Sequence, residues 1–272
     1  MTAVLRRPVQ ADPAVPPAPR RRRHRLVLGG GLILALLAVW EIAALAAPRT
    51  RFYLSSPTDV VATLGTLTGD GTFWSLHVLT TARGFAAGWA IAVVAGIGLG
   101  VLMGWSRAIR ETLEPFVFVL NAVPRVALIP LLVVWLGYGF AYQVTVVALW
   151  SVFPVLLDTI AGVRDAKASL VRMARVFGAS PGQVLVTVAL PGSVPLVMAG
   201  VRQALSHAIT GVVGAEIWAS AAGIGWVIAD AAQTVQVERI IAAVVLVAVA
   251  GAVLNELLGV LERRLTRWKE PV

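Results

Sequence analysis

The chain has 272 residues, of which 58% are hydrophobic and 14% charged, with a formal net charge of +9 and no cysteine. Soluble domains usually carry about 25% charged residues, so this composition excludes an ordinary water-soluble fold and favours a membrane protein. The lack of cysteine excludes disulfides, thiolate metal sites and cysteine nucleophiles. The basic residues lie mainly between apolar runs, which indicates orientation in a membrane rather than nucleic-acid binding.

Residues 1–25 are rich in proline and end in a cluster of arginines. Such a segment buries too little apolar surface to fold, so we expect a disordered basic tail. The first apolar run, 26–47, is interrupted only by Glu41 and predicts a membrane span. A basic region, an apolar stretch and Ala44-Leu45-Ala46 also resemble a cleavable signal peptide, although this run is long for a signal core.

Five further apolar runs are long enough to cross a bilayer, which needs about 20 apolar residues in a helix. The predicted fold is therefore an all-α integral membrane protein with six spans between residues 26 and 262, followed by a basic tail at 263–272. The five runs cover 80–103, 114–136, 142–163, a stretch from Pro195 to about 213, and 239–261.

Two of these runs carry residues that shape helix packing. In the second, Gly96, Gly100 and Gly104 recur every four residues, so they lie on one face and permit close contact with another helix. In the third, Pro124 and Pro130 each remove a helical hydrogen bond, and we expect a kink or break near Pro124. Broken backbone at membrane depth lies beside protein or a water-filled cavity, so this segment is a candidate for lining a pathway.

Lysine and arginine are distributed unequally between the two sides of the predicted membrane protein. The side that holds both termini, 104–113 and 164–186 has 17 of them, whereas the other side has 4. Short loops with an excess of positive charge stay in the cytoplasm. Both termini are therefore predicted to be cytoplasmic.

The polar stretch 164–190 predicts a short amphipathic helix over 165–178, between two spans. Gly178 can end this helix because glycine accepts the left-handed conformation, and Pro181 prevents its continuation. On pattern alone the helix could be an ordinary surface helix. Its apolar residues, at helical spacing, are Leu170, Met173, Ala174 and Phe177.

This stretch resembles the cytoplasmic motif of permeases from ATP-binding-cassette importers, which is Glu-Ala-Ala, three residues, Gly, nine residues, then Ile-x-Leu-Pro. The chain has Arg172-Met173-Ala174, then Gly178, and after nine residues Val188-Ala189-Leu190-Pro191. The spacing matches throughout, and Ala174, Gly178, Leu190 and Pro191 match in identity. Arg172 stands where the motif has Glu, and Met173 where it has Ala. These departures concern the charge pairing with the ATPase and not the socket geometry.

Further segments, in the same order along the chain, resemble the nitrate, sulfonate and taurine branch of these permeases. They are Trp40-Glu41, Leu54-Ser55-Ser56-Pro57, the run from Pro124 to Leu131, Trp135-Leu136-Gly137, Gly200-Val201-Arg202, Glu216 with Gly223-Ile224-Gly225, and Glu262-Arg263-Arg264.

The resemblance implies a type I importer permease in the bacterial inner membrane, surrounded by lipid and assembled as a homodimer or paired with a second permease. It also implies two cytoplasmic ATP-binding subunits and an extracytoplasmic substrate-binding protein. The helix at 165–178 would be the coupling helix that contacts the ATPase. Its contact residues would be Arg172, Ala174, Gly178, Leu190 and Pro191.

No catalytic residue, cofactor or metal ion is expected in this chain. It has no Gly-x-x-x-x-Gly-Lys-Ser/Thr phosphate loop, so ATP must be hydrolysed by another chain. The histidines His24, His77 and His207 have no spaced partners for a metal site. An intramembrane enzyme would need a nucleophile and a base that the sequence does not show, and a passive channel would not need a helix with this motif spacing.

Two arginines, Arg125 and Arg202, fall within predicted spans. A central arginine in a membrane helix costs at least about 2.5–3.5 kcal/mol, so it generally faces protein or water. Either these side chains attract an anionic substrate, or they form internal ion pairs, for instance with Asp158.

Three more residues complete the candidates for a translocation pathway. Pro124 breaks its helix, His207 is expected to pack between helices, and Glu216 is either an external gate residue or a solvated loop charge. The resemblance implies a small anionic cargo such as nitrate, a sulfonate or taurine. A vitamin precursor, for example a thiamine pyrimidine precursor, is the alternative cargo.

Overall fold

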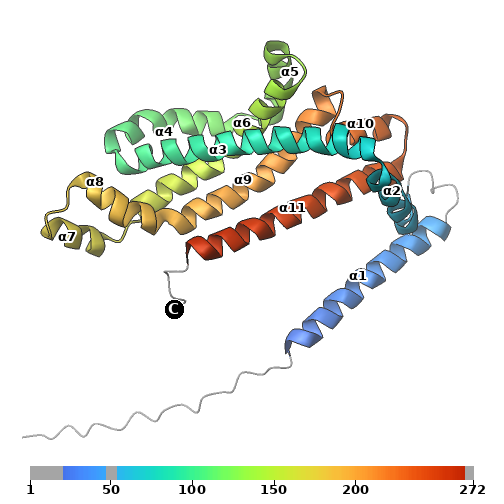
Figure 1. Ribbon diagram of the computed structural model, residues 1–272, viewed down its shortest axis with the longest axis horizontal. Helices are drawn as coiled ribbons and strands as arrows, with labels where there is room; N and C mark the ends of the chain where they lie inside the picture. Colours follow the sequence, from blue (N-terminus) through green and yellow to red (C-terminus); the bar gives the residue numbers. More distant parts are fainter. Residues whose placement is uncertain (1–20, 47–53, 267–272) are drawn as a thin grey trace, which may run out of the picture.

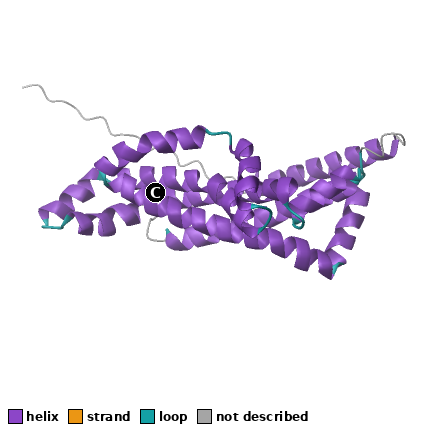
Figure 2. Cartoon of the chain, turned by 90° about the horizontal axis from the view of Figure 1, so that it is seen from above, coloured by secondary structure: helices purple, strands orange, loops and turns teal. Residues whose placement is uncertain are grey.

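The computed structural model describes residues 21–46 and 54–266, with side chains described from residue 29 onward. Within these ranges all regular elements are helical. Figure 1 shows an elongated bundle whose longest helices run side by side along the long axis, and Figure 2 shows the same helices from above, joined by short loops. Basic tails were predicted at 1–25 and 263–272, and of these 1–20 and 267–272 lie outside the described residues. The prediction was wrong for 21–25 and 263–265, which are helical and belong to the ends of α1 and α11.

In the described part of the chain, five helices are long and apolar enough to cross a membrane, and a bent pair gives a sixth if it counts as one span. The five are α1 (Arg21–Ala46), η1 with α3 (Phe73–Val78 and Leu79–Trp105), α6 (Phe140–Arg164), α8 with η2 and α9 (Pro181–Val184, Leu185–Ala189 and Leu190–Ala219), and α11 (Val237–Leu265). The bent pair is α4 (Arg107–Ala122) and α5 (Arg125–Leu136), and the short helices are α2 (Pro57–Gly69), α7 (Ala168–Val176) and α10 (Ile224–Gln233).

The predicted break near Pro124 is confirmed. Helix α4 ends at Ala122, Pro124 precedes α5 in an extended conformation, and the two helix axes are bent by 93°. The proline ring excludes the preceding helical turn and has no N–H to donate. As a result α5 projects away from the main bundle (Figure 1), whereas Pro130 lies inside α5 without ending it.

Two predicted starting points were wrong, because both helices begin earlier. The second spanning helix starts at Phe73 rather than residue 80, and the fifth starts at Pro181 rather than near Pro195. A π-helical turn, Leu185–Ala189, directly precedes the helical segment in which Pro191 occupies the first turn. This wider turn makes room for the Pro191 ring, and the helix continues through Pro191 and Pro195.

The bundle centre is formed by α6, which packs between α3 and α9. On its α3 side the contact follows a row of glycines that begins at Gly84 and Gly88 and continues through the three glycines expected from the sequence. An added Cβ would lie 2.5 Å from Val147 at Gly88, 2.5 Å from Thr159 at Gly100, and 2.8 Å from Val163 at Gly104. The predicted close helix contact is therefore confirmed, and the two helices run parallel in a constant register.

Helix α1 stands apart from this centre and is joined to it through α2 (Figure 1). The Trp40 indole Nε1 donates to the Ser55 carbonyl oxygen at 3.0 Å, and the Glu41 carboxylate accepts from the Thr58 hydroxyl at 2.8 Å. The Ser56 hydroxyl caps the first turn of α2 by accepting from the Asp59 N–H. The interruption of the first apolar run at Glu41 is thus explained by a structural contact with α2.

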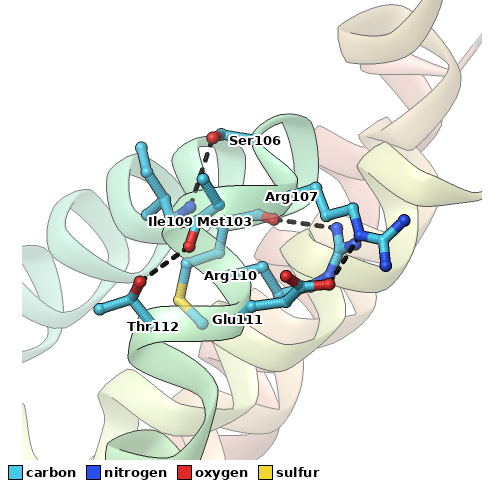
Figure 3. Close-up of polar contacts among 8 residues, drawn as sticks. Met103, Ser106, Arg107, Ile109, Arg110, Glu111 and Thr112 are labelled. Carbon is cyan, nitrogen blue, oxygen red and sulfur yellow. Dashed lines mark hydrogen bonds and ion pairs between the residues drawn. The ribbon is translucent and has the colours of Figure 1, made fainter.

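The reversal from α3 to α4 is fixed by local polar contacts, shown in Figure 3. The Ser106 hydroxyl accepts from the Ile109 N–H at 3.4 Å and so caps α4, as small hydroxyl residues commonly do. The Arg110 guanidinium donates to the Met103 carbonyl oxygen at 3.4 Å, and Arg107 pairs with Glu111 at 2.6 Å. These contacts turn the chain back at the end of the bundle that also carries α7.

Candidate functional site

Helix α7 lies in the loop between α6 and α8, at one end of the bundle (Figure 1). It is shorter than the predicted 165–178, but it ends where expected. Gly178 has a φ of +81°. The Gly178 N–H donates to the Arg175 carbonyl at 3.0 Å, and the Ala179 N–H donates to the Ala174 carbonyl at 3.0 Å. This pair of bonds is the Schellman arrangement, which requires a left-handed residue at the position of Gly178.

The next helix begins after a very short turn. The Ser180 hydroxyl accepts from the Gln183 N–H at 3.3 Å, and the Gln183 side-chain oxygen accepts from the Ser180 N–H at 2.7 Å. This reciprocal capping box, with Pro181 in the first turn, defines the start of α8. Because both ends of the turn are hydrogen-bonded, the direction of α7 is set relative to α8.

The apolar face of α7 lines a groove against the start of α9, with a cavity volume of about 330 Å³. We call this the α7 groove, and its residues are Leu170, Met173, Ala174, Phe177, Thr187, Val188, Pro191 and Gly192. Phe177 at the edge of the groove is 84% exposed, and Val176 beside it is 85% exposed. The helix thus carries apolar side chains at its tip that no described residue covers.

The residues of the predicted motif come together at this groove. Ala174 and Pro191, far apart in the motif, line the same cavity, and Gly178 makes the turn between them. Leu190 lies half-buried in the first turn of α9. Arg172 is exposed, and within the described ranges it has no ion-pair partner.

Glu216 lies near the opposite end of the bundle and is 1% exposed. Its carboxylate accepts from the Thr81 hydroxyl at 2.7 Å, the Gln143 amide at 2.6 Å and the Gly225 N–H at 2.8 Å. These four residues, which we call the Glu216 cluster, join α3, α6, α9 and α10. The alternative of a solvated loop charge was therefore wrong, because the side chain is buried within α9 and its acceptor sites are occupied.

Glycines allow the surrounding backbone to reach this carboxylate. Gly223 has a φ of +116°, and a Cβ there would overlap the Glu216 carboxylate. At Gly225 a Cβ would lie 2.6 Å from the Glu216 Cβ. The Gln143 side chain occupies the space that a Cβ on Gly84 would need. These contacts explain the two glycines of the Gly223-Ile224-Gly225 segment, because a larger residue at either position would prevent the loop from packing onto Glu216.

The structure gives each of the two candidate arginines a protein partner. The Arg125 guanidinium donates to the Asn121 side chain at 2.7 Å and to the Trp150 carbonyl at 3.3 Å, and it lies over the Phe153 ring. Arg202 forms an ion pair with Glu262 that joins α9 to α11. An internal ion pair was one of the two interpretations, but its suggested partner Asp158 was wrong.

The remaining pathway candidates do not form one site. Pro124 lies at the break between α4 and α5, and His207 is half-buried in α9. Neither is part of the Glu216 cluster, whose members come from other positions. The described residues hold no group of three or more histidine, aspartate or glutamate side chains that could bind a metal ion.

Sequence reasoning missed Thr81 and Gln143 as partners of Glu216, and it counted Arg83 with the charges outside the membrane although the predicted span 80–103 includes it. Gln143 is a polar residue in an otherwise apolar run, which is a usable signal for a buried contact. Extending the four-residue glycine spacing back to Gly88 and Gly84 would also have shown that the contact face runs along most of this helix.

The bundle of apolar helices with a polar loop helix at one end defines a polytopic α-helical membrane protein. The family of binding-protein-dependent transport system inner membrane components matches residues 92–267. The chain belongs to this family, which confirms the family of permeases that the sequence motifs indicated.

Three proteins similar to this chain are named for the transport of different compounds. A putative aliphatic sulfonates transport permease, SsuC of Bacillus subtilis, is 30% identical over 94% of this chain and 92% of its own length. The taurine transport system permease TauC of Escherichia coli is 31% identical over 90% of each chain. The riboflavin transport system permease RibX of Chloroflexus aurantiacus is 31% identical over 87% of this chain and 88% of its own length.

Proposed function

We propose that α7 is the site at which this importer permease receives a separate, cytoplasmic ATP-hydrolysing subunit. The proposal is carried by one observation: α7 ends in a Schellman turn, and Ala174 of α7 and Pro191 of α9, both in the importer motif, line one groove. Val176 and Phe177 add an exposed apolar tip. Exposed apolar patches of this kind commonly mark contacts with another protein.

The helix that follows α7 supplies a route for transmitting movement. From Pro181 to Ala219 it runs through 39 residues and reaches the Glu216 cluster at the far end of the bundle. At 1.5 Å per residue, this is about 58 Å. A displacement of α7 by a closing ATPase would therefore move a rigid rod whose other end contacts α3, α6 and α10.

We infer that the α7 end of the bundle is cytoplasmic, together with both termini. Of the described basic residues, Arg239 lies near the opposite end, at the start of α11. Basic residues enriched at the α7 end favour retention on the cytoplasmic side. They are Arg107, Arg110, Arg164, Lys167, Arg172, Arg175, Arg263 and Arg264.

The cargo we propose is a small anion, such as a sulfonate, taurine or nitrate. The sulfonate and taurine permeases among the relatives support it. A vitamin or vitamin precursor is the second candidate, which the riboflavin permease favours. In either case an extracytoplasmic binding protein would deliver the cargo, and two copies of this chain within the lipid bilayer would form the pathway.

A cysteine placed at Phe177 tests the docking proposal and the orientation together, because the chain has no other cysteine. We expect Phe177→Cys to crosslink to a cysteine introduced in the surface groove of the co-expressed ATPase subunit. A membrane-impermeant maleimide added to intact cells should leave Phe177→Cys unlabelled. As a matched control, Thr234→Cys at the other end of the bundle should react.

Labelling of Phe177→Cys in intact cells would contradict the orientation. If Phe177→Cys is labelled only after the membrane is disrupted but forms no crosslink with any cysteine placed on the ATPase subunit, the docking assignment is contradicted.

A further inference from the structure

Arg83 is a charged residue inside a membrane-spanning helix. It lies well within the helix that begins at Phe73, about 15 Å from its start at 1.5 Å per residue. An arginine within an apolar span is costly and generally faces protein or a water-filled cavity. Unlike Arg125 and Arg202, Arg83 has no hydrogen-bond or ion-pair partner among the described residues.

The Arg83 side chain borders a cavity of about 270 Å³ between α3, α6 and α9. We call it the Arg83 cavity, and its walls include Thr80, Arg83, Phe140, Tyr142, Ala219 and Ser220. This volume lies just below the roughly 300–1,000 Å³ of pockets for drug-sized ligands. The cavity therefore suits a smaller molecule.

The hydroxyl groups around the cavity already have acceptors. Thr80 donates to the Leu76 carbonyl at 2.6 Å, Tyr142 to the Ala215 carbonyl at 3.4 Å, and Ser220 to the Ala222 carbonyl at 2.5 Å. Arg83 is the basic side chain of this wall, and no described residue accepts a hydrogen bond from its guanidinium. The cavity wall thus carries a positively charged side chain, Arg83, whose N–H groups have no acceptor among the described residues.

Glu216 also borders this cavity, but its carboxylate is occupied by the Glu216 cluster. Its oxygens accept four hydrogen bonds from three donors, so they are turned toward α3, α6 and α10. The first turn of α6 lines another part of the wall through Gly139 and Phe140, and no side chain caps this turn. Its free N–H groups add to the positive potential.

We propose that the Arg83 cavity is a binding site for a small organic anion, which Arg83 holds by its sulfonate or carboxylate group. A guanidinium presents paired donors that match the oxygens of such groups. Phe140 and Ala219 would contact the carbon part of the anion, which an inorganic ion lacks. This inference rests on the proposed anionic cargo. It assigns recognition of the anion to Arg83 rather than to Arg125 or Arg202.

Charge-selective thiol labelling tests the site directly, because the chain has no natural cysteine. Thr80→Cys places one thiol in the cavity, a single turn from Arg83. Purified protein would be treated with sulfonatoethyl methanethiosulfonate, a small organic sulfonate, and with the cationic trimethylammonioethyl reagent. Thr66→Cys, exposed on α2, supplies the intrinsic rate ratio of the two reagents.

We expect the anionic reagent to be favoured at Thr80→Cys by roughly tenfold more than at Thr66→Cys, which corresponds to about 1.4 kcal/mol. Adding Arg83→Gln should bring the ratio down to the Thr66→Cys value, whereas Arg83→Lys should keep most of it. Ethanesulfonate should slow labelling at Thr80→Cys and leave Thr66→Cys unchanged. Equal ratios at the two positions, or a ratio that Arg83→Gln leaves intact, would overturn the proposal.

The labelling requires no ATPase, so this inference and the proposed function fail separately. A sulfonate preference at Thr80→Cys without ATPase docking at α7 would refute the docking and keep the site. Docking without a sulfonate preference would refute the site alone. A size-exclusion profile equal to that of the parent protein verifies that the Arg83→Gln variant is folded.

Discussion

Replacing Glu216 by leucine should abolish most of the folded protein. The substitution leaves the Thr81 hydroxyl, the Gln143 amide and the Gly225 N–H buried without their acceptor. Each unsatisfied buried donor costs about 1–3 kcal/mol, so the total is several kcal/mol, comparable with the stability of a whole domain. Glu216→Gln keeps the side-chain shape and one acceptor oxygen. It should lose less, because a donor to only one of the two carboxylate oxygens is left without its acceptor.

The measurement is the thermal midpoint and the monodisperse yield of detergent-purified protein. Glu111→Gln is the matched control, since Glu111 forms an exposed pair with Arg107 and exposed pairs contribute little. We expect the order Glu111→Gln, Glu216→Gln, Glu216→Leu, from the most to the least stable. A thermal midpoint of Glu216→Leu equal to that of Glu111→Gln would show that the cluster does not hold the helices together.

Replacing Gly100 by leucine should also prevent correct packing. A Cβ at Gly100 would lie 2.5 Å from the Thr159 Cβ and 3.0 Å from the Leu156 carbonyl, so α3 and α6 would have to separate. Overpacking a close contact typically costs about 1–3 kcal/mol, and more where backbone rather than a flexible side chain is in the way. We expect loss of most folded protein.

Gly98 supplies the control in the same helix. It is exposed, and a Cβ there would meet nothing within 4 Å. Gly98→Leu should therefore insert and fold at the level of the parent protein, measured by yield and size-exclusion profile. If the two leucine variants behaved alike, α3 and α6 would not be packed through the glycine row.

Much of this fold could be predicted because membrane helices are encoded locally. Apolar runs give the spans, Pro124 gives the break, and Gly178 gives the end of α7, each from the conformational limits of a single residue type. The four-residue spacing of glycines likewise gave the face of α3 that contacts a neighbour.

The site was less predictable because its contacts join distant helices. Nothing in the sequence pairs Arg202 with Glu262, or Glu216 with Thr81 and Gln143. The start of the second span was misplaced because polar residues in the π-helical turn Phe73–Val78 interrupt the apolar pattern. Arg83, which lies close to the predicted start of this span, was counted with the charges outside the membrane.

The central claim, that α7 couples this permease to an ATPase, is tested most directly by Gly178→Val. Valine at a φ of +81° is strained by about 1–3 kcal/mol, so it should undo the Schellman turn and redirect α7. Gly182→Val is the control, because Gly182 lies in α8 with open space around it. The measurement is the amount of ATPase subunit retained by each purified, monodisperse permease. We predict retention near the parent level for Gly182→Val and at least a tenfold loss for Gly178→Val. Equal retention by both variants would contradict the assignment of α7 as the ATPase contact.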